Sequence, residues 1–508
     1  MSEFLARFTA INGAVNDFVW VKVGLWLLIG AGIVMTACTG FFQITHLRHW
    51  WGKTIGGIFA KSSNARSNSD HKAISQFQAL CTALAATIGT GNIAGVSAAI
   101  VLGGPGAVFW MWVAAFFGMM TGYSEKVLGI YYRRRNPSGE WSGGAMYYLQ
   151  DGLGSKKGCK TIGKVLAILF AILTMLAAFG IGNMAQVNKI TLNLKSAFFD
   201  TVNAGTIFGD IDLVSFIIGV VLMVLSGLII LGGLKRIANV AEKLVPFMAV
   251  IYMVGSLVII ICNIGKVGSM FAAIFKFAFG TKAMVGGAVG IAFKTAITQG
   301  CKRGVFSNEA GLGSLVMVHS TANVKEPVHQ GMWGLFEVFF DTIVVCTCTA
   351  LVVLSSGQID LGTGLAAVGT DDATLVAQSF GNIFGKGGEM FVAVALLLFA
   401  FTTILGWSIY GAKAVEYLMG EKAVKVYRVI FVLMIISGAI MTSSLAWDIA
   451  DTFNGMMMIP NLIGVLALSP LVVKITRNYI HRNIQGKQEK PMFSYDPKIQ
   501  KEMEEKEL

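Results

Sequence analysis

Long apolar stretches constrain this chain more than any other feature of its sequence. They recur eleven times, and each approaches the length of about twenty residues that an α-helix needs to cross a bilayer. They are continuous rather than alternating in polarity, which favours helices over a membrane β-barrel. The spans are expected near residues 19–42, 76–100, 105–131, 162–188, 213–232, 239–263, 284–300, 329–354, 389–412, 427–444 and 452–474. The sequence therefore predicts an all-α polytopic membrane protein with 11 transmembrane helices.

Composition supports this class and argues against others. Only 13% of the residues are charged while 55% are hydrophobic, which leaves too little charge to cover a soluble domain. The net charge of +12 does not require a nucleic acid partner, because most of the 40 basic residues fall in alternate loops between the spans. The seven cysteines show no paired metal-ligand spacing, so we expect no metal centre or other cofactor.

The loops between the spans differ in charge. If the eleven spans alternate in direction, the basic loops all fall on one side, among them 126–164 and 301–327. Loops on the opposite side carry acidic residues such as Asp212, Asp360 and Asp451. Because loops rich in lysine and arginine normally remain in the cytoplasm, the basic side is expected to be the inner one.

This orientation places both ends of the chain. The N-terminal segment 1–18 is expected outside the cell (inner) membrane, followed by the first span at 19–42. The C-terminal segment 475–508 is expected in the cytoplasm. Its sequence is polar and mixed in charge, which is typical of a disordered tail.

The second span is interrupted in its middle by the sequence GTGN, residues Gly89–Asn92. An unwound stretch at membrane depth is tolerated only where it lines a protein-walled cavity. The freed amides of Thr90 and Gly91 would head a half-helix, whose positive dipole end suits a carboxylate. Freed carbonyls, the Asn92 amide oxygen and the Thr90 hydroxyl suit a small hard cation such as sodium. The alternative is that these small residues only allow close helix packing.

A second glycine-rich stretch suggests an internal repeat. Residues Val285–Gly290 lie in the seventh span, five spans after the first interruption. Since five is odd, the two five-helix units would have opposite orientations. Interrupted helices at matching positions of inverted halves indicate the central site of a transporter.

Three motifs resemble one known family. GGPGAVFWMWVAAFFG at Gly103–Gly118 is similar to the signature of the alanine or glycine:cation symporters, often called sodium:alanine symporters. GTGNIAGV and GCKRGVFSNEAGLGS (Gly300–Ser314) resemble two further blocks of that family. The resemblance implies the leucine-transporter-type fold of 5+5 inverted helices. Its repeats would cover 76–263 and 284–474, with 19–42 as an extra N-terminal helix.

The resemblance also implies a site. The amides of Thr90 and Gly91 would bind the substrate carboxylate, and Asn92 would help to hold a cation. A second sodium would lie between the second span and the stretch LLFAFTTILGW. Its ligands would be the hydroxyls of Thr402 and Thr403 together with the backbone carbonyls of Ala85 and Ile88. From the residues alone, adjacent hydroxyls in an apolar helix could instead bond to their own backbone.

Thr403 is also a candidate for the substrate site, and two further side chains join it. Trp407 lies one turn beyond Thr403 and could limit the size of the substrate side chain, although a lone aromatic residue commonly serves packing. Gln186, in a polar cluster of the fourth span, could touch substrate.

Charged residues near the spans suggest two more roles. Glu337 and Asp341 are four residues apart on one face of the eighth span, where carboxylates normally face the bundle interior. They could couple a cation or serve a structural role. Lys302, Arg303 and Glu309 could form a charge network that closes an inner gate, or they could simply belong to a basic cytoplasmic loop.

These features predict a secondary symporter that couples sodium influx to uptake of a small neutral amino acid, alanine or glycine. Proton coupling on the same fold and, less favoured, an ion channel are alternatives; a channel needs repeated filter elements, and none is evident. The sequence lacks HExxH, GxSxG with a partner base, and GxxxxGK[ST], so an enzyme or a primary pump is not expected. The expected partners are the amino acid, sodium and the lipid bilayer, with no nucleic acid and no obligatory protein.

Overall fold

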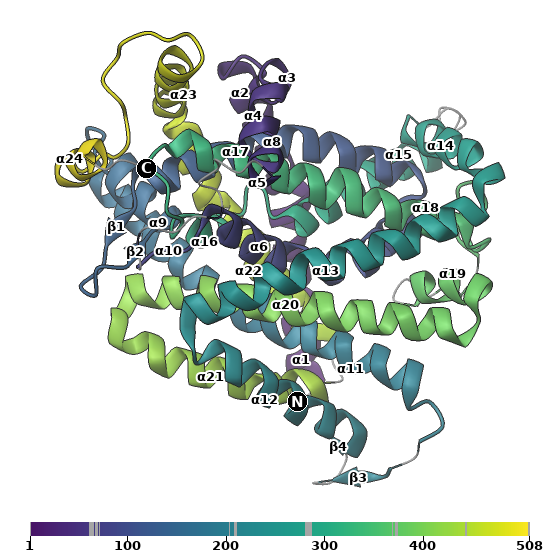
Figure 1. Cartoon of the computed structure of the whole chain (residues 1–508). Helices are drawn as coiled ribbons and strands as arrows, with labels where there is room; N and C mark the ends of the chain where they lie inside the picture. Colours follow the sequence, from purple (N-terminus) through teal and green to yellow (C-terminus); the bar gives the residue numbers. More distant parts are fainter. Residues whose placement is uncertain are drawn as a thin grey trace.

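The computed structural model of the chain describes most of its length. The described residues are 2–59, 66, 70, 72–202, 204–207, 211–279, 287–367, 369–370, 374–441 and 444–505. The described chain is mainly helical, and its only sheets are two short two-stranded hairpins (Figure 1).

Nine helices of the described chain are long and apolar enough to cross a membrane, and a bent pair raises the number to 10. This confirms a helical polytopic membrane protein. The elements of these spans are α1 (Ser2–Asp17), η1 (Phe18–Gly24) and α2 (Leu25–Cys38); the bent pair with α6 (Gln76–Thr87), η2 (Gly91–Gly95) and α7 (Val96–Gly103); α8 (Gly106–Tyr131); α10 (Lys160–Phe179), η4 (Gly180–Met184) and α11 (Ala185–Phe198); α12 (Leu213–Ile230); α13 (Gly233–Cys262); α17 (Pro327–Val338), η5 (Phe339–Cys346) and α18 (Thr347–Ser355); α20 (Lys386–Met419); α21 (Glu421–Ile440); and α22 (Ser444–Ala467).

The remaining elements are shorter or lie between the spans. They are α3 (Phe42–Thr45), α4 (Leu47–Lys53), α5 (Ile55–Phe59), β1 (Arg134–Arg135), β2 (Trp141–Ser142), α9 (Ala145–Tyr147), η3 (Tyr148–Leu153), β3 (Thr206–Ile207), β4 (Ile211–Asp212), α14 (Ile264–Ala278), α15 (Gly287–Asn308), α16 (Val316–His319), α19 (Leu375–Phe384), α23 (Ser469–Asn483) and α24 (Pro497–Glu505). Strands β1 and β2 pair antiparallel, as do β3 and β4.

The seventh expected span coincides with α15, which is not among the candidate spans of the described chain. Eleven spans therefore remain a prediction. Of the stretch Val285–Gly290, in which the sequence suggested an interruption, residues 285–286 lie outside the described residues and 287–290 are helical.

The expected interruption of the second span is present. Helix α6 begins with a capping box, in which Ser75 and Gln78 exchange side-chain-to-backbone hydrogen bonds. The helix ends at Thr87, where Ile88 leaves helical geometry. The axis bends by 55° before α7 continues the span. The glycines of the sequence GTGN thus separate two half-helices rather than sit inside one continuous rod.

A second interruption follows α15 and corrects the sequence prediction of a cytoplasmic loop at 301–327. Residues up to Asn308 belong to α15, and a buried turn leads from there to α16. In this turn Glu309, Gly311 and Gly313 have φ values of 54°, 95° and 77°. A glutamate in this left-handed region is uncommon and is held by its surroundings, which is a feature of functional sites.

Small residues bring the helices around these interruptions into close contact. A Cβ atom on Gly406 of α20 would lie 2.6 Å from the Cβ of Ala86 in α6. A Cβ on Gly182 of η4 would lie 2.4 Å from Trp407. Such contacts let helix backbones approach each other, which is the usual packing mode of membrane helices. Large apolar side chains such as Leu228 and Ile261 are more than half exposed on the outside, as expected for a surface that faces lipid.

The hairpins mark two opposite ends of the molecule. Figure 1 shows β1, β2 and α24 at one end and β3, β4, α14 and α19 at the other. The basic run Arg133–Arg135 lies at the first end and Asp212 at the second.

Two sequence expectations about the first end are corrected. The C-terminal segment is not a disordered tail over its described residues 475–505, because Phe493, Ile499 and Met503 are buried against Ala73 and Trp141. Its apolar residues supply enough contact to order it. Lys126, counted among the basic loop residues, is fully buried inside α8.

Candidate functional site

The two helix interruptions face each other. Gly91, which begins the half-helix η2–α7, lies against the last turn of α15: a Cβ on Gly91 would be 3.1 Å from Phe306 Cδ1 and 3.4 Å from Ser307 Cα. The first interruption thus meets, inside the bundle, the end of α15 from which the second interruption starts. Irregular backbone at this depth is stable only where protein or a lined cavity surrounds it.

A small cavity lies at this meeting point. Its lining combines both interruptions with the middle of α20 and with η4, α11 and α22. The lining residues are Ala86, Thr87, Gly89, Thr90, Gly91, Ile181, Gln186, Phe306, Glu309, Thr403, Trp407 and Asn454. Five residues proposed from the sequence for substrate, Thr90, Gly91, Gln186, Thr403 and Trp407, are therefore brought together around one cavity.

Thr90 and Gln186 connect the first interruption to the neighbouring helix. The Thr90 hydroxyl donates to Oε1 of Gln186 at 3.1 Å, and Gln186 Nε2 donates to the carbonyl of Ile181 at 3.1 Å. The first amides of a helix have no partner within that helix, and they carry its positive dipole end. The η2–α7 half-helix starts at Gly91, next to this cavity. An anion would be stabilised here.

Asn92 points away from the cavity into a polar cluster with Asp341. Its Nδ2 donates to Asp341 Oδ1 at 2.7 Å, while its Oδ1 accepts from the Gly89 amide at 3.0 Å. Ser307 and Thr342 donate to Asp341 Oδ2 at 2.7 and 2.9 Å. The cluster is fully buried and joins α15, η2 and η5. Of the two carboxylates proposed for coupling, Asp341 is the one beside the interruption.

The two threonines proposed for sodium have different surroundings. Both hydroxyls donate to the carbonyl of Phe399, at 2.9 Å for Thr402 and 3.0 Å for Thr403. Thr402 lies against the sulfur of Met248, whereas the hydroxyl of Thr403 faces Gly89, whose added Cβ would be 2.5 Å from it. Thr403 therefore reaches the interruption directly, next to the helix turn that carries the carbonyls of Ala85 and Ile88.

The three residues proposed for an inner gate are not joined in the structure. Lys302 Nζ pairs with Asp451 at 2.7 Å, and Arg303 stacks near the Phe306 ring at 5.9 Å. Glu309 lines the cavity, as does Trp407, and it accepts a hydrogen bond from Ser314 at 2.5 Å. The sequence predicted that these three residues lie in one loop. In the structure, Glu309 bonds to Ser314, whereas Lys302 and Arg303 contact Asp451 and Phe306.

Glu337 occupies a separate buried ion-pair cluster. Its Oε2 is 2.9 Å from Lys126 Nζ and 3.3 Å from His319 Nε2, and all three side chains are inaccessible to solvent. Gln330 Nε2 and His319 Nδ1 are 2.6 Å apart. This cluster ties α8 and α17 to the short helix α16, and it lies apart from the residues that line the candidate cavity.

Sequence reasoning missed several residues of this region. Phe306, Asn454 and Ile181 line the cavity, and Ser307 contacts Asp341, but none of the four was singled out. The signal for Phe306 and Ser307 was present, because both belong to the third family-like motif. The only sequence signal for Asn454 was that a polar residue occurs within an apolar helix.

Comparison with known proteins decides the family. The model of the sodium:alanine symporter family matches residues 5–494. This chain belongs to the sodium:alanine symporter family. It is 45% identical over 94% of its length to the sodium/alanine symporter AgcS of Methanococcus maripaludis, of which 98% is covered. It is also 35% identical over 96% of its length to a probable sodium/glutamine symporter, GlnT, of Bacillus subtilis, with 93% of that protein covered.

A solved structure supports the fold of this sodium:alanine symporter family member. The crystal structure of MhsT in complex with L-phenylalanine matches with a TM-score of 0.52 and 13% sequence identity, over 80% of this chain and 99% of MhsT. MhsT has the leucine-transporter-type fold. The chain is therefore a membrane transporter of the class that performs cation-coupled amino-acid symport, and not an enzyme.

Proposed function

We propose that this protein couples the influx of sodium to the uptake of a small neutral amino acid, alanine or glycine, by alternating access. The observation that carries the proposal is the meeting of two helix interruptions around one small buried cavity. Discontinuous helices that meet near mid-membrane supply both dipole ends for an anionic group and backbone oxygens for a cation.

The cavity suits the two charged groups of an amino-acid zwitterion. The substrate carboxylate would bind the amides of Thr90 and Gly91, where the half-helix dipole favours negative charge. The carboxylate of Glu309 lines the same cavity and would face the ammonium group. Trp407 and Phe306 would close the remaining space and restrict the substrate to a short side chain.

Sodium would bind on the side of the interruption away from the aromatic rings. Asp341 and the hydroxyls of Ser307 and Thr342 provide hard oxygen ligands, which sodium prefers. Asn92 would orient Asp341 and the Gly89 backbone. A second sodium would use Thr403 with the carbonyls of Ala85 and Ile88, and Thr402 is the less favoured hydroxyl because it faces Met248.

The topology belongs to the proposal as well. Eleven spans in two inverted repeats, 76–263 and 284–474, would follow the extra helix at 19–42. The second interruption would then be the turn from Glu309 to Ser314 rather than Val285–Gly290. Segment 1–18 would lie outside and segment 475–508 in the cytoplasm of a cell whose inner membrane holds the protein, because the basic end of the molecule is expected inside.

The coupling would be thermodynamic. Sodium beside Asp341 and Thr403 would order the first interruption, and this order completes the amino-acid site. Amino acid must then raise sodium affinity by the same factor by which sodium raises amino-acid affinity. Joint occupancy would favour closure of the outer path and opening of the inner one.

Purified protein in proteoliposomes tests this function. Uptake of radiolabelled alanine, glycine, serine and leucine is measured with a sodium gradient or a proton gradient imposed separately. We expect saturable uptake of alanine and glycine that requires the sodium gradient. Uptake driven only by protons would favour the proton-coupled alternative, and conductance without saturable uptake would favour a channel.

A further inference from the structure

A second cavity, of about 290 Å³, lies next to hairpin β1–β2. Its walls come from the residues that precede α6, from the first turn of α13, from the last third of α20 and from the start of α21. Ser408 and Ile409 of this wall directly follow Trp407, which lines the candidate site. Helix α20 therefore borders both cavities, and the second cavity lies further along α20, toward the end of the molecule that carries the hairpin.

The hairpin covers this cavity and is fastened to α20 and α21. Lys413 Nζ donates to the carbonyl of Trp141 at 3.1 Å, and Asn136 Nδ2 donates to Glu416 Oε1 at 3.3 Å. At the turn of the hairpin, the Ser138 hydroxyl donates to Glu421. Asn136 itself lines the cavity. One edge of the hairpin is thus held to the helices on one side of the opening.

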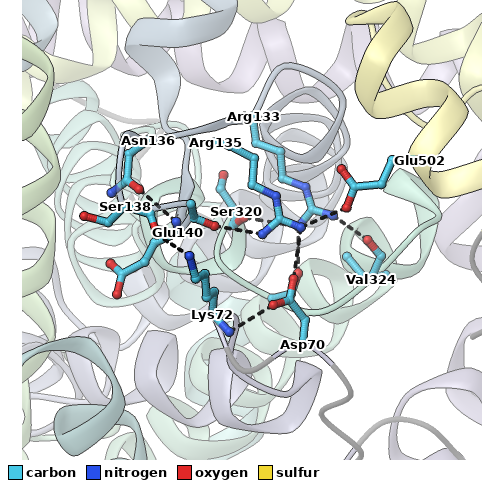
Figure 2. A network of polar contacts seen from close by, with 12 residues as sticks. Asp70, Lys72, Arg133, Arg135, Asn136, Ser138, Glu140, Ser320, Val324 and Glu502 are labelled. Atoms are coloured by element: carbon cyan, nitrogen blue, oxygen red, sulfur yellow. Dashed lines mark hydrogen bonds and ion pairs between the residues drawn. The ribbon is translucent and has the colours of Figure 1, made fainter.

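The opposite edge is fastened to the segment that leads into the broken helix α6. Lys72 Nζ donates to the Ser138 carbonyl at 2.5 Å, and Arg135 Nη2 lies 3.1 Å from Asp70 Oδ2. Figure 2 shows Asp70 beside Arg135 of the hairpin, and Lys72 on the same side. The hairpin therefore bridges the opening from α20 and α21 to the start of α6.

The C-terminal segment holds the hairpin from outside. Glu502 of α24 lies 3.0 Å from Arg135 Nη2, on the guanidinium that also binds Asp70 (Figure 2). Trp141 lies 3.9 Å from the guanidinium carbons of both Arg133 and Arg135, and it is buried with Phe493, Ile499 and Met503. The tail thus covers the base of the hairpin with an apolar cluster and one ion pair.

The ion pairs that hold the hairpin to Asp70 and Glu502 are weak enough to open. The side chains of Arg135, Asp70 and Glu502 are 25%, 15% and 38% exposed, and ion pairs in contact with water contribute little to stability. The pair between Lys126 and Glu337 is fully buried and cannot separate without a large cost. The ion pairs of Arg135 with Asp70 and Glu502 can therefore separate while the interior cluster stays intact.

We propose that hairpin β1–β2 and helix α24 together form an inner gate, and that the cavity beneath them is the vestibule through which the transported amino acid leaves. The gate takes the place of the one that the sequence suggested for Lys302, Arg303 and Glu309. Passage of an amino acid through this gate depends on the proposed function. Opening of the gate can be measured without any transport.

Labelling of a cysteine in the vestibule tests the gate. Ala412 lines the cavity and is replaced by cysteine in a full-length chain whose more exposed cysteines are replaced by alanine; these are Cys38, Cys159, Cys262 and Cys348. The protein is placed in inside-out vesicles and treated with a membrane-impermeant maleimide. The Arg135→Gln variant loosens the ties to Asp70 and Glu502 without shortening the chain, and truncation after Gly486 removes α24 entirely.

We expect labelling of the cysteine at 412 to become about tenfold faster in Arg135→Gln and in the truncated chain. The matched control carries Lys501→Ala and Glu505→Ala on the exposed face of α24, and its labelling rate should match that of the parent. Equal labelling rates in all four proteins would overturn the gate. Faster labelling in the variants, together with no binding of alanine to the parent, would preserve the gate and reject the proposed substrate.

Discussion

The side-chain amide of Asn92 donates a hydrogen bond of 2.7 Å to Oδ1 of Asp341 and so joins the interrupted second span to η5, 249 residues further along the chain. Both groups are fully buried. A carboxylate placed there is costly unless a partner compensates its charge. The hydrogen bonds from Asn92, Ser307 and Thr342 supply part of that compensation, and a bound cation would supply the rest.

Replacing Asp341 by asparagine should therefore weaken sodium binding more than it weakens the fold. The substitution keeps the shape of the side chain and removes its charge. We expect the sodium concentration for half-maximal alanine uptake to rise by about tenfold or more, a loss of about 1.4 kcal/mol or more. This concentration is measured from the dependence of alanine uptake into proteoliposomes on the sodium concentration. Glu389→Gln, a change at a 40% exposed carboxylate outside the site, is the control; equal curves for the two variants would reject the cation assignment.

The close approach of Gly89 to Thr403 predicts that even a methyl group is harmful there. A Cβ on Gly89 would lie 2.5 Å from Thr403 Oγ1, so the α6–α20 contact would have to open. Gly89→Ala should reduce alanine uptake by at least about tenfold, because overpacking of this kind costs about 1–3 kcal/mol. Gly95→Ala is the matched control, since its Cβ would meet only the Thr90 carbonyl at 4.0 Å. Similar uptake by both variants would contradict the tight packing of the interruption.

Lys126→Met should destabilise the protein strongly. It leaves the Glu337 carboxylate buried without its 2.9 Å partner, and breaking one side of a buried pair costs about 3–5 kcal/mol. Adding Glu337→Gln should restore much of the loss, because the unpaired charge is then removed. Thermal unfolding of the detergent-purified proteins provides the comparison. If the single variant melts at the same temperature as the parent, the pair is not a structural cluster.

Sequence reasoning predicted the first interruption, with Thr90 and Gly91 of the cavity, because glycines, an amide and a hydroxyl stand out within an apolar span. Thr403 was expected only through the family resemblance. It misplaced the second interruption because Lys302 and Arg303 read as loop residues. In the structure the positive charge of Lys302 is balanced by the carboxylate of Asp451, which is 149 residues away in the sequence. No local sequence pattern reveals such a partner. The same applies to Lys126 and Glu337, which are 211 residues apart.

Asp212 gives a pH-dependent prediction at the other end of the molecule. It caps α12 through Ser215 and pairs with Lys195 at 2.8 Å, and these contacts lower its pKa to about 2. Because the pKa is lower in the folded state than in the unfolded state (about 3.9), its stabilising effect is complete above pH 4 to 5. The effect is then lost as the pH falls through 4 toward about 2.

Asp212→Ala should therefore lower the melting temperature at pH 7 and pH 5 by the same amount, equivalent to about 1 kcal/mol for a lost helix cap. At pH 3 the gap between parent and variant should be smaller, because the Asp212 carboxylate is then largely protonated in the unfolded parent but still mostly ionised in the folded one. Thermal shift measurements at the three pH values provide the test. A gap that stays constant or widens at pH 3 would contradict the role of the ionised side chain.

The central claim is that the facing helix interruptions hold an amino acid together with sodium. Binding of alanine to the purified protein tests this claim most directly. Isothermal titration calorimetry would give the dissociation constant of alanine in sodium chloride and in choline chloride at one pH and ionic strength. The account predicts binding at least about tenfold tighter in sodium, with a reciprocal gain of sodium affinity when alanine is present. Equal dissociation constants in the two salts would contradict it.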